Sequence, residues 1–311
     1  MKNETVTKKI DFKPFTPKDK ALYEQYLKQE GERGCEFSFA NLFLWGRQSF
    51  AVLDGHVVIF SQFSRRSVYP YPLGSGDKKK ALDAIIADAA ERGIPCRITG
   101  ICKTGRETLE ALYPSRFRFH ADEGSFDYVY DINDLADLKG KKYHGKRNHL
   151  HRFHEAFPNC TVEELSDTNL TRVRSMVKDW YVKRLLENPN ADYHMEEAAF
   201  ERALRHYKEL CMEGLVLLDG ERVLAVTLAS RLSEDTFDVH FEKALPDVRG
   251  AYTAVNAELA RHIRAKYPSV RYLDREEDMG LEGLRRAKES YHPHHKIEKC
   301  WACLLEDGYD Y

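Results

Sequence analysis

The chain has 311 residues, of which 42% are hydrophobic and 12% aromatic, a composition typical of a packed globular protein rather than a disordered one. A formal net charge of -2 excludes the overall basic field of a non-specific nucleic-acid binder, so any polyanion contact must be local. No apolar run is long enough to span a bilayer, the N-terminal MKNETVTKKIDF lacks a signal-peptide core, and the cysteines are scattered, so we expect a cytoplasmic protein.

The first half of the chain contains a helix signal, a hairpin and an α/β segment. Thr16 is placed as an N-cap with Pro17 at the first helical position. The β-rich runs of residues 49–60 surround Asp54-Gly55, a strong hairpin signal. A glycine-bearing turn, YPYPLGSG, then precedes an amphipathic helix that ends at Gly93, and a strand, PCRITG, and KTGRETLEAL follow.

A strongly basic segment, KGKKYHGKRNHLHRF (139–153), lies in the middle of the chain and predicts a helix over about 141–157. Because no acid interrupts it, Lys142, Lys146, Arg147 and Arg152 are expected to form a local cationic surface. That surface could receive a tRNA acceptor stem or the phosphates of coenzyme A. The alternative is an exposed interdomain helix whose charges only keep it solvated.

The second half repeats the order of the first. Helices are expected from about Ser166 and at about 195–212, followed by a hairpin around Asp219-Gly220. Next come a strand (TFDVHFEKAL), a turn (PDVRG), a helix (AYTAVNAELARHIRAKY), a strand (VRYLDRE) and DMGLEGLRRA. This pattern indicates an internal duplication, with modules at 1–135 and 136–311 and the basic helix between them.

The order of elements resembles that of the GNAT acyltransferase module, which implies an α/β (α+β) fold of two tandem modules with mixed sheets flanked by helices. In that fold two neighbouring strands part, and the following turn and helix N-terminus hold the pyrophosphate of coenzyme A. The corresponding residues are Arg249, Gly250, Ala251 and Tyr252, with Asn256 further along the helix. Their glycine pattern is only partly present, so coenzyme A or acyl-CoA is a possible donor and not an obligatory cofactor. The first module, with LGSGDKKKAL at this point, is expected to be degenerate.

Three segments carry a family resemblance: residues 138–153, 240–259 and 273–293, the last of which reads LDREEDMGLEGLRRAKESYHP. There the chain resembles the C-terminal domain of phosphatidylglycerol lysyltransferases, a tandem GNAT family related more distantly to Fem-type aminoacyltransferases. The resemblance implies an aminoacyl-tRNA donor. The membrane region of the best-known members is absent from this sequence, so the acceptor is open between a small molecule, a peptide and a lipid head group.

Several polar residues are the candidates for chemistry. Glu242 is expected to orient or deprotonate an amine, and Arg275 to hold a phosphate or an oxyanion. Asp278 or Glu276 is a candidate for binding an α-ammonium group, and Tyr291 is the candidate for the general acid, by analogy with GNAT enzymes. The alternative is that Glu242–Arg275 and Asp278–Arg285 are structural ion pairs.

We expect no metal site. The CWAC motif at 300–303 has no second ligand pair at comparable spacing, and SYHPHHK is interrupted by Pro293. The sequence therefore predicts an acyl- or aminoacyl-transferase, with aminoacyl-tRNA as leading donor and acyl-CoA as the alternative. A non-catalytic ligand-binding tandem GNAT protein is the second alternative.

Overall fold

A computed structural model describes residues 9–305 except 32, 64, 65 and 191. The chain divides into a first unit, formed by residues up to Phe126 together with those from Ile297 onward, and a second unit, Asp127–Lys296. This division differs from the predicted boundary between residues 135 and 136, because residues 127–135 belong to the second unit and the C-terminal segment belongs to the first. Residues 1–8, part of the stretch read for a signal segment, lie outside the described residues.

The first unit contains a seven-stranded sheet in the order β1-β2-β3-β4-β5-β14-β6. Its hairpin turns at Asp54 and Gly55, whose φ angles of 45° and 76° suit the Asp-Gly pair that predicted it. Thr16 and Asp19 form the expected capping box, and Asp77 caps α3 by accepting from the N–H of Lys79. The elements are β1 (Lys13–Pro14), η1 (Pro17–Asp19), α1 (Lys20–Leu27), η2 (Cys35–Phe37), α2 (Phe39–Trp45), β2 (Gln48–Leu53), β3 (His56–Phe63), β4 (Arg66–Pro70), α3 (Lys78–Arg92), β5 (Arg97–Ile101), α4 (Lys103–Leu112), β6 (Phe117–Ala121), η3 (Glu123–Ser125) and β14 (Cys300–Leu304).

The second unit contains a seven-stranded sheet in the order β13-β7-β12-β11-β10-β9-β8. Its first long helix begins at Leu170, a few residues later than predicted, because Asn169 rather than Ser166 is the N-cap residue. The elements are β7 (Asp127–Asp131), α5 (Ile132–Asp137), η4 (Lys141–Tyr143), α6 (His144–Ala156), β8 (Thr161–Glu164), α7 (Leu170–Glu187), α8 (His194–His206), β9 (Glu213–Asp219), β10 (Arg222–Arg231), β11 (Thr236–Ala244), α9 (Ala251–Lys266), β12 (Tyr272–Asp274), α10 (Glu282–Glu289) and β13 (His295–Ile297).

The two sheets repeat one strand order, and each contains one strand from the other half of the sequence. In the first sheet β14 pairs antiparallel with both β5 and β6. In the second sheet β7 pairs antiparallel with β12 and lies next to β13. Each repeat therefore contributes its last strand to the other repeat's sheet. Because of this exchange, the division into compact units does not coincide with the sequence period.

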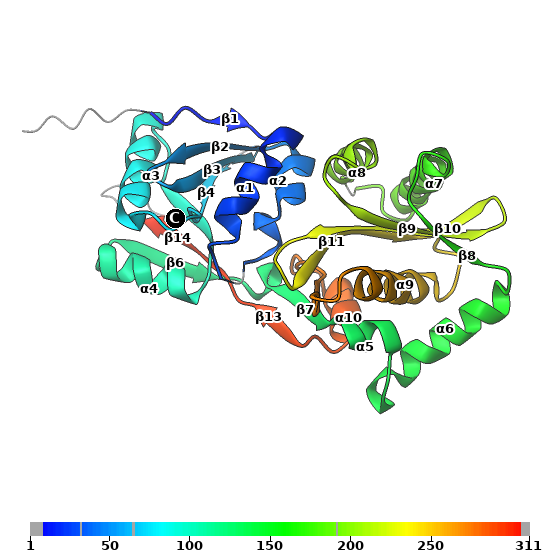
Figure 1. The fold of residues 1–311 in the computed structure, drawn as a ribbon. Coiled ribbons are helices and arrows are strands. Elements are labelled where there is room, and N and C mark those ends of the chain that lie inside the picture. Colours follow the sequence, from blue (N-terminus) through cyan, green and yellow to red (C-terminus); the bar gives the residue numbers. More distant parts are fainter. Residues whose placement is uncertain (1–8, 32, 64–65, 191, 306–311) are drawn as a thin grey trace, which may run out of the picture. The chain divides into compact units, whose positions relative to one another are not determined.

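Helices cover both faces of the second sheet. Figure 1 shows α7 and α8 on one face of β8–β11 and α9 on the other. Buried apolar side chains pack between the sheet and α9, among them Leu215, Phe237 and Leu259. The register of β11 with β10 shifts between Val239 and Phe241, so Phe237 and Glu242 both face α9 whereas Phe241 packs on Phe200 of α8.

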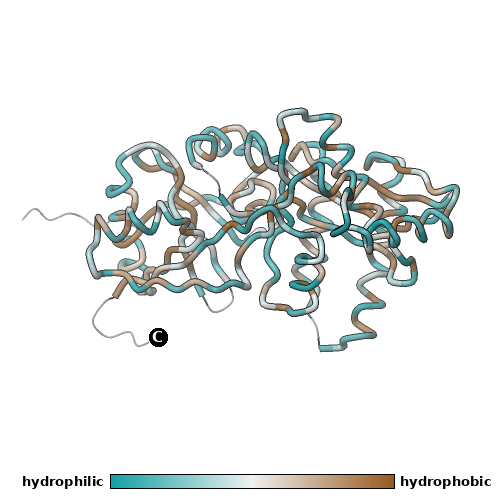
Figure 2. Tube along the Cα trace, turned by 90° about the horizontal axis from the view of Figure 1, so that it is seen from below, coloured by the Kyte–Doolittle hydropathy of each residue, from teal (hydrophilic) through white to brown (hydrophobic). Residues whose placement is uncertain are grey.

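Hydrophobic and hydrophilic residues are interleaved along the whole trace (Figure 2). Among the residues that the structure describes, no helix combines the length and the apolar character needed to cross a membrane.

Candidate active site

The site lies where β11 and β12 part. These parallel strands pair only from Thr236–Tyr272 to Asp238–Asp274, yet β11 continues to Ala244. Glu242 lies on the part of β11 that does not pair with β12, and Arg275 follows the end of β12. The expected splay of two neighbouring strands is therefore present, and the two predicted residues lie on its two sides.

Glu242 and Arg275 form a nearly buried ion pair across this opening. Arg275 Nη2 lies 3.1 Å from Glu242 Oε1, and the two side chains are only 16% and 11% exposed. Asn256 of α9 donates from Nδ2 to Glu242 Oε2 at 3.1 Å. Burial alone would lower the pKa of Arg275, but the adjacent carboxylate raises it above its ordinary value. Three predicted site residues are thus brought together.

Tyr291 and Lys146 lie beside this pair. The Arg275 guanidinium carbon is 4.8 Å from the centroid of the Tyr291 ring, and Lys146 Nζ is 3.6 Å from the same centroid. Tyr291 Oη donates to Thr253 Oγ1 at 3.3 Å, and burial, opposed by Arg275, raises its pKa. Burial, and then the charge of Arg275, lower the pKa of Lys146 to about 8. Lys146, predicted to bind polyanions, is therefore part of the polar cluster at the site.

Both carboxylate oxygens of Asp278 accept hydrogen bonds from other groups of the chain. Its Oδ2 accepts from Tyr128 Oη and from Arg285 Nε, both at 2.7 Å, and its Oδ1 accepts from the Gly280 N–H at 2.8 Å. The bond from Arg285 outweighs burial and lowers the pKa of Asp278 to about 2. This geometry favours the structural alternative: Asp278 holds the loop after β12 and is not placed to bind an ammonium group.

Lys288 was not predicted, and it fixes the backbone that carries Arg275. Its Nζ donates to the carbonyl oxygens of Arg275, of Glu276 at 2.9 Å and of Glu277 at 2.7 Å. It is only 8% exposed. In the sequence Lys288 is one more base late in a helix, and no pattern there distinguishes it from a solvated lysine.

The turn predicted to bind a pyrophosphate is covered by the basic helix. Gly250 has a φ of 84°, and a side chain there would place its first carbon 2.3 Å from the carbonyl oxygen of His149 on α6. Of its predicted companions, Ala251 is buried, Arg249 is exposed, and Tyr252 accepts from Trp180 Nε1 of α7 at 3.3 Å. The backbone approach of α6 therefore explains the glycine without a ligand.

An acid of α5 and two backbone carbonyls engage two of the four bases of the predicted cationic surface. Lys142 Nζ lies 2.9 Å from Asp134, and Arg147 donates to the carbonyl oxygens of Leu138 and Gly140. Arg152 is exposed. The sequence run is free of acids, but the fold supplies them from the preceding helix, and α6 packs with Tyr143 and Phe153 buried within the second unit.

One cluster has the ligand types of a metal site. Carboxylate oxygens of Asp238 and Glu276 and a ring nitrogen of His240 lie within 4.8 Å of one another. His240 Nε2 is also 2.8 Å from Ser230 Oγ, which fixes the ring. The expectation of no metal stays a prediction.

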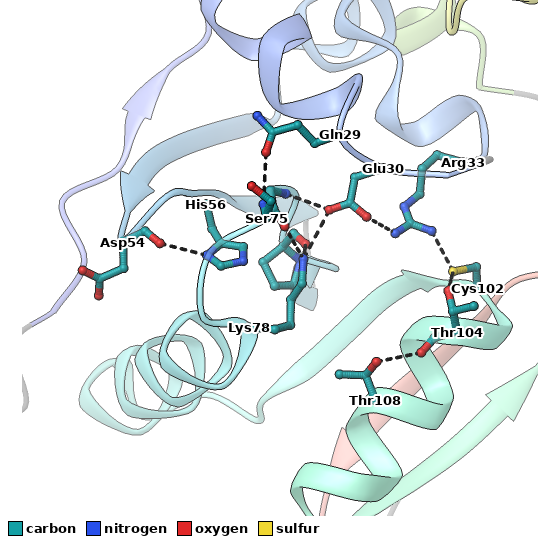
Figure 3. Close-up of polar contacts among 12 residues, drawn as sticks. Gln29, Glu30, Arg33, Asp54, His56, Ser75, Lys78, Cys102, Thr104 and Thr108 are labelled. Carbon is teal, nitrogen blue, oxygen red and sulfur yellow. Dashed lines mark hydrogen bonds and ion pairs between the residues drawn. The ribbon is translucent and has the colours of Figure 1, made fainter.

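In the first unit, the corresponding turn is filled by the protein's own side chains (Figure 3). Glu30 Oε1 accepts from the N–H of Gly74 at 2.7 Å, and Gln29 Oε1 accepts from that of Ser75 at 3.1 Å. Lys78 Nζ lies 3.2 Å from Glu30, and Arg33 pairs with the other carboxylate oxygen. Burial would raise the pKa of Glu30, but the Gly74 N–H, Lys78 and Arg33 together lower it. A carboxylate therefore stands where an anionic ligand of this turn would bind.

The profile of the family described as "Phosphatidylglycerol lysyltransferase, C-terminal" matches residues 28–303. The chain belongs to this family. A conserved protein of unknown function from Bacteroides thetaiotaomicron is 34% identical, with a TM-score of 0.89 over 95% of this chain and 100% of that one. L-PGS from Bacillus licheniformis is 17% identical, with a TM-score of 0.66 over 96% of this chain and 94% of that one.

More distant relatives show the fold alone. FemX and a tandem GNAT protein from the clavulanic acid biosynthesis pathway share it at 11% and 8% identity, with TM-scores of 0.59 and 0.50 and at least 95% of this chain covered. The predicted fold of two tandem GNAT-like modules is thereby confirmed. An uncharacterised protein of Mycoplasmoides gallisepticum is 24% identical over 182 residues, which span 57% of this chain and 56% of that relative. Family and fold together support a transferase of the acyl or aminoacyl kind.

Proposed function

We propose that this protein transfers an aminoacyl group from aminoacyl-tRNA to an amine or hydroxyl acceptor, and that the second unit does the chemistry. The observation that carries the proposal is the nearly buried Glu242–Arg275 pair at the parted strands. Arg275 Nη1 is buried and has no hydrogen-bond partner among the described residues. A guanidinium with a free N–H in a largely dehydrated place suits a carbonyl oxygen that becomes negative during transfer.

The chemistry needs three events, and the cluster has a group for the first two. The acceptor's lone pair attacks the ester carbonyl, whose oxygen Arg275 stabilises. The acceptor loses a proton to Lys146, because a lysine with a pKa of about 8 is partly neutral near pH 7. The bond from the carbonyl carbon to the ribose oxygen of the tRNA breaks, and that oxygen takes up a proton. An amide or ester and a deacylated tRNA are the products.

The packing of α6 on α9 favours aminoacyl-tRNA over coenzyme A as the donor. The carbonyl oxygen of His149 lies against Gly250, at the turn where a GNAT enzyme would hold the pyrophosphate of coenzyme A. In the first unit the equivalent turn is bonded to Glu30 and Gln29. Both turns are therefore engaged by the chain itself. Exposed Arg152 and the neighbouring bases of α6 are left to contact a polyanion.

The second candidate is a coenzyme A-dependent N-acyltransferase, which the GNAT-like fold favours. A transfer assay separates the two candidates: the purified chain is incubated with tRNA charged by labelled amino acids, or with labelled acetyl-CoA, and with mixtures of amines, peptides and lipids. Aminoacyl transfer that is lost in Arg275→Lys, which keeps a positive charge beside Glu242, supports the proposal. Transfer from acetyl-CoA alone overturns it, and binding without any product supports a non-catalytic protein.

A further inference from the structure

Two buried oxygen acceptors lie beside Glu242 on the face of the sheet that α9 covers. The register of β10 and β11 places Thr227 directly opposite Glu242, so that their side chains share a face. The adjacent Lys243 lies on the other face, where its Nζ is 3.8 Å from the ring centroid of Trp180 on α7. Asn256 reaches the same carboxylate from α9.

Thr227 and Asn256 are each 0% exposed. Thr227 Oγ1 and Asn256 Oδ1 nevertheless have no hydrogen-bond partner among the residues that the structure describes. Native proteins rarely leave such buried atoms unpaired, so each calls for a hydrogen-bond donor beyond the described residues. The orientation of Asn256 is fixed by its neighbour, because a carboxylate can only accept and so must face the amide's N–H₂ group.

The chemical type of the ligand follows from these atoms. The Thr227 hydroxyl, the Asn256 carbonyl and the Glu242 carboxylate offer three oxygen acceptors, one of which carries a negative charge. A primary ammonium group has three N–H donors and a positive charge to match them. Arg275 shares the Glu242 carboxylate and offers its free Nη1–H, which suits a carbonyl oxygen.

An ammonium group and a carbonyl held by neighbouring groups of one cluster describe an α-aminoacyl group. An acetyl or fatty acyl group has no N–H to satisfy the buried Asn256 oxygen. We propose that Thr227, Glu242 and Asn256 bind the protonated α-amino group of the donor, while Arg275 takes its carbonyl oxygen. This inference rests on the proposed function and deepens it, because it assigns the recognition of a free amino group to named residues.

The test uses the full chain, tRNA charged with each amino acid, and the same charged tRNAs after N-acetylation. N-acetylation removes the positive charge and leaves one N–H. We expect transfer from at least one charged tRNA and at least a tenfold lower kcat/KM for its N-acetylated form. Equal rates from both forms would overturn the ammonium subsite while the proposed function stands, whereas no transfer from either form overturns the proposed function itself.

Substitutions at Thr227 provide a second readout that a merely structural role would not give. Thr227→Val removes a hydroxyl that is unpaired in the free protein and keeps the side chain's shape, so we expect an unchanged or higher melting temperature. The same variant is expected to raise KM for the charged tRNA about tenfold, while Thr227→Ser keeps the wild-type KM. A destabilised Thr227→Val variant with wild-type KM would show that the hydroxyl serves the fold, and would refute the subsite.

Discussion

The Glu242–Arg275 pair gives the most quantitative prediction. With both side chains largely buried, Arg275→Met leaves the Asn256 N–H₂ group as the hydrogen-bond donor to Glu242 that the described residues provide. Two unit charges about 4 Å apart interact by about 4 kcal/mol at an effective dielectric constant of about 20. Breaking a buried pair from one side costs about 3–5 kcal/mol in measured cases. We therefore expect the free energy of unfolding of the second unit to fall by about 3–5 kcal/mol.

The measurement is urea denaturation followed by intrinsic fluorescence, with Arg286→Met as control. Arg286 lies on α10, its side chain is 73% exposed and its partner Glu282 is 3.8 Å away, so its loss should change stability by less than about 0.5 kcal/mol. The double variant Glu242→Gln/Arg275→Met is expected to recover much of the loss, because no buried charge remains. An Arg275→Met variant as stable as the control would refute the reasoning, since it would mean that water solvates Glu242 at no cost.

Three further outcomes are expected from other contacts. The pKa of Lys146 in the folded protein is about 8, below its ordinary value of 10.5. The wild type should therefore gain stability relative to Lys146→Met as the pH rises from about 8 to about 10.5. Urea denaturation at several pH values across that range measures this difference. Glu30→Gln should weaken the hold on Gly74 and let millimolar sulfate raise the melting temperature more than in wild type. Asp134→Asn should release Lys142 and tighten tRNA binding with a steeper salt dependence in filter-binding assays.

Each of these outcomes has a control. A Lys146→Met variant whose stability runs parallel to wild type above pH 8 would mean that the amine is not held in a depressed state. Glu24→Gln removes a carboxylate that only pairs with Lys20 on α1, so it should show no sulfate effect. If Asp134→Asn binds tRNA as wild type does, α6 is not the polyanion surface.

Local patterns predicted most of the elements, because their causes are local. The two Asp-Gly hairpins, the capping box at Thr16 and the end of α3 at Gly93 all stand where the sequence placed them. The pairing of Glu242 with Arg275 was also among the alternatives. It followed from placing one residue on each of two strands that part, which needs only the order of elements.

The rest could not be read from the sequence, because it depends on what the fold brings near. In the sequence Asp278 is a candidate ligand for an ammonium group, but the fold brings Tyr128, from a strand far earlier in the chain, to donate to its carboxylate. The basic run from Lys139 to Phe153 contains no acid, but the fold pairs its Lys142 with Asp134 of α5. Thr227 is an ordinary strand residue in the sequence, and only the register of β10 with β11 sets its hydroxyl beside Glu242.

The exchange of β7 and β14 changes what each half of the chain can do alone. Arg275 follows β12, which pairs with β11 on one side for three positions and with β7 on the other. The strand β7 lies before residue 136, where the predicted second module starts. A fragment that begins there lacks β7 and its Tyr128, so it loses both the edge pairing of β12 and a bond to Asp278. The loop that carries Arg275 would then be held mainly by Lys288 from one side. The candidate site of the second unit therefore depends on a strand encoded by the first repeat.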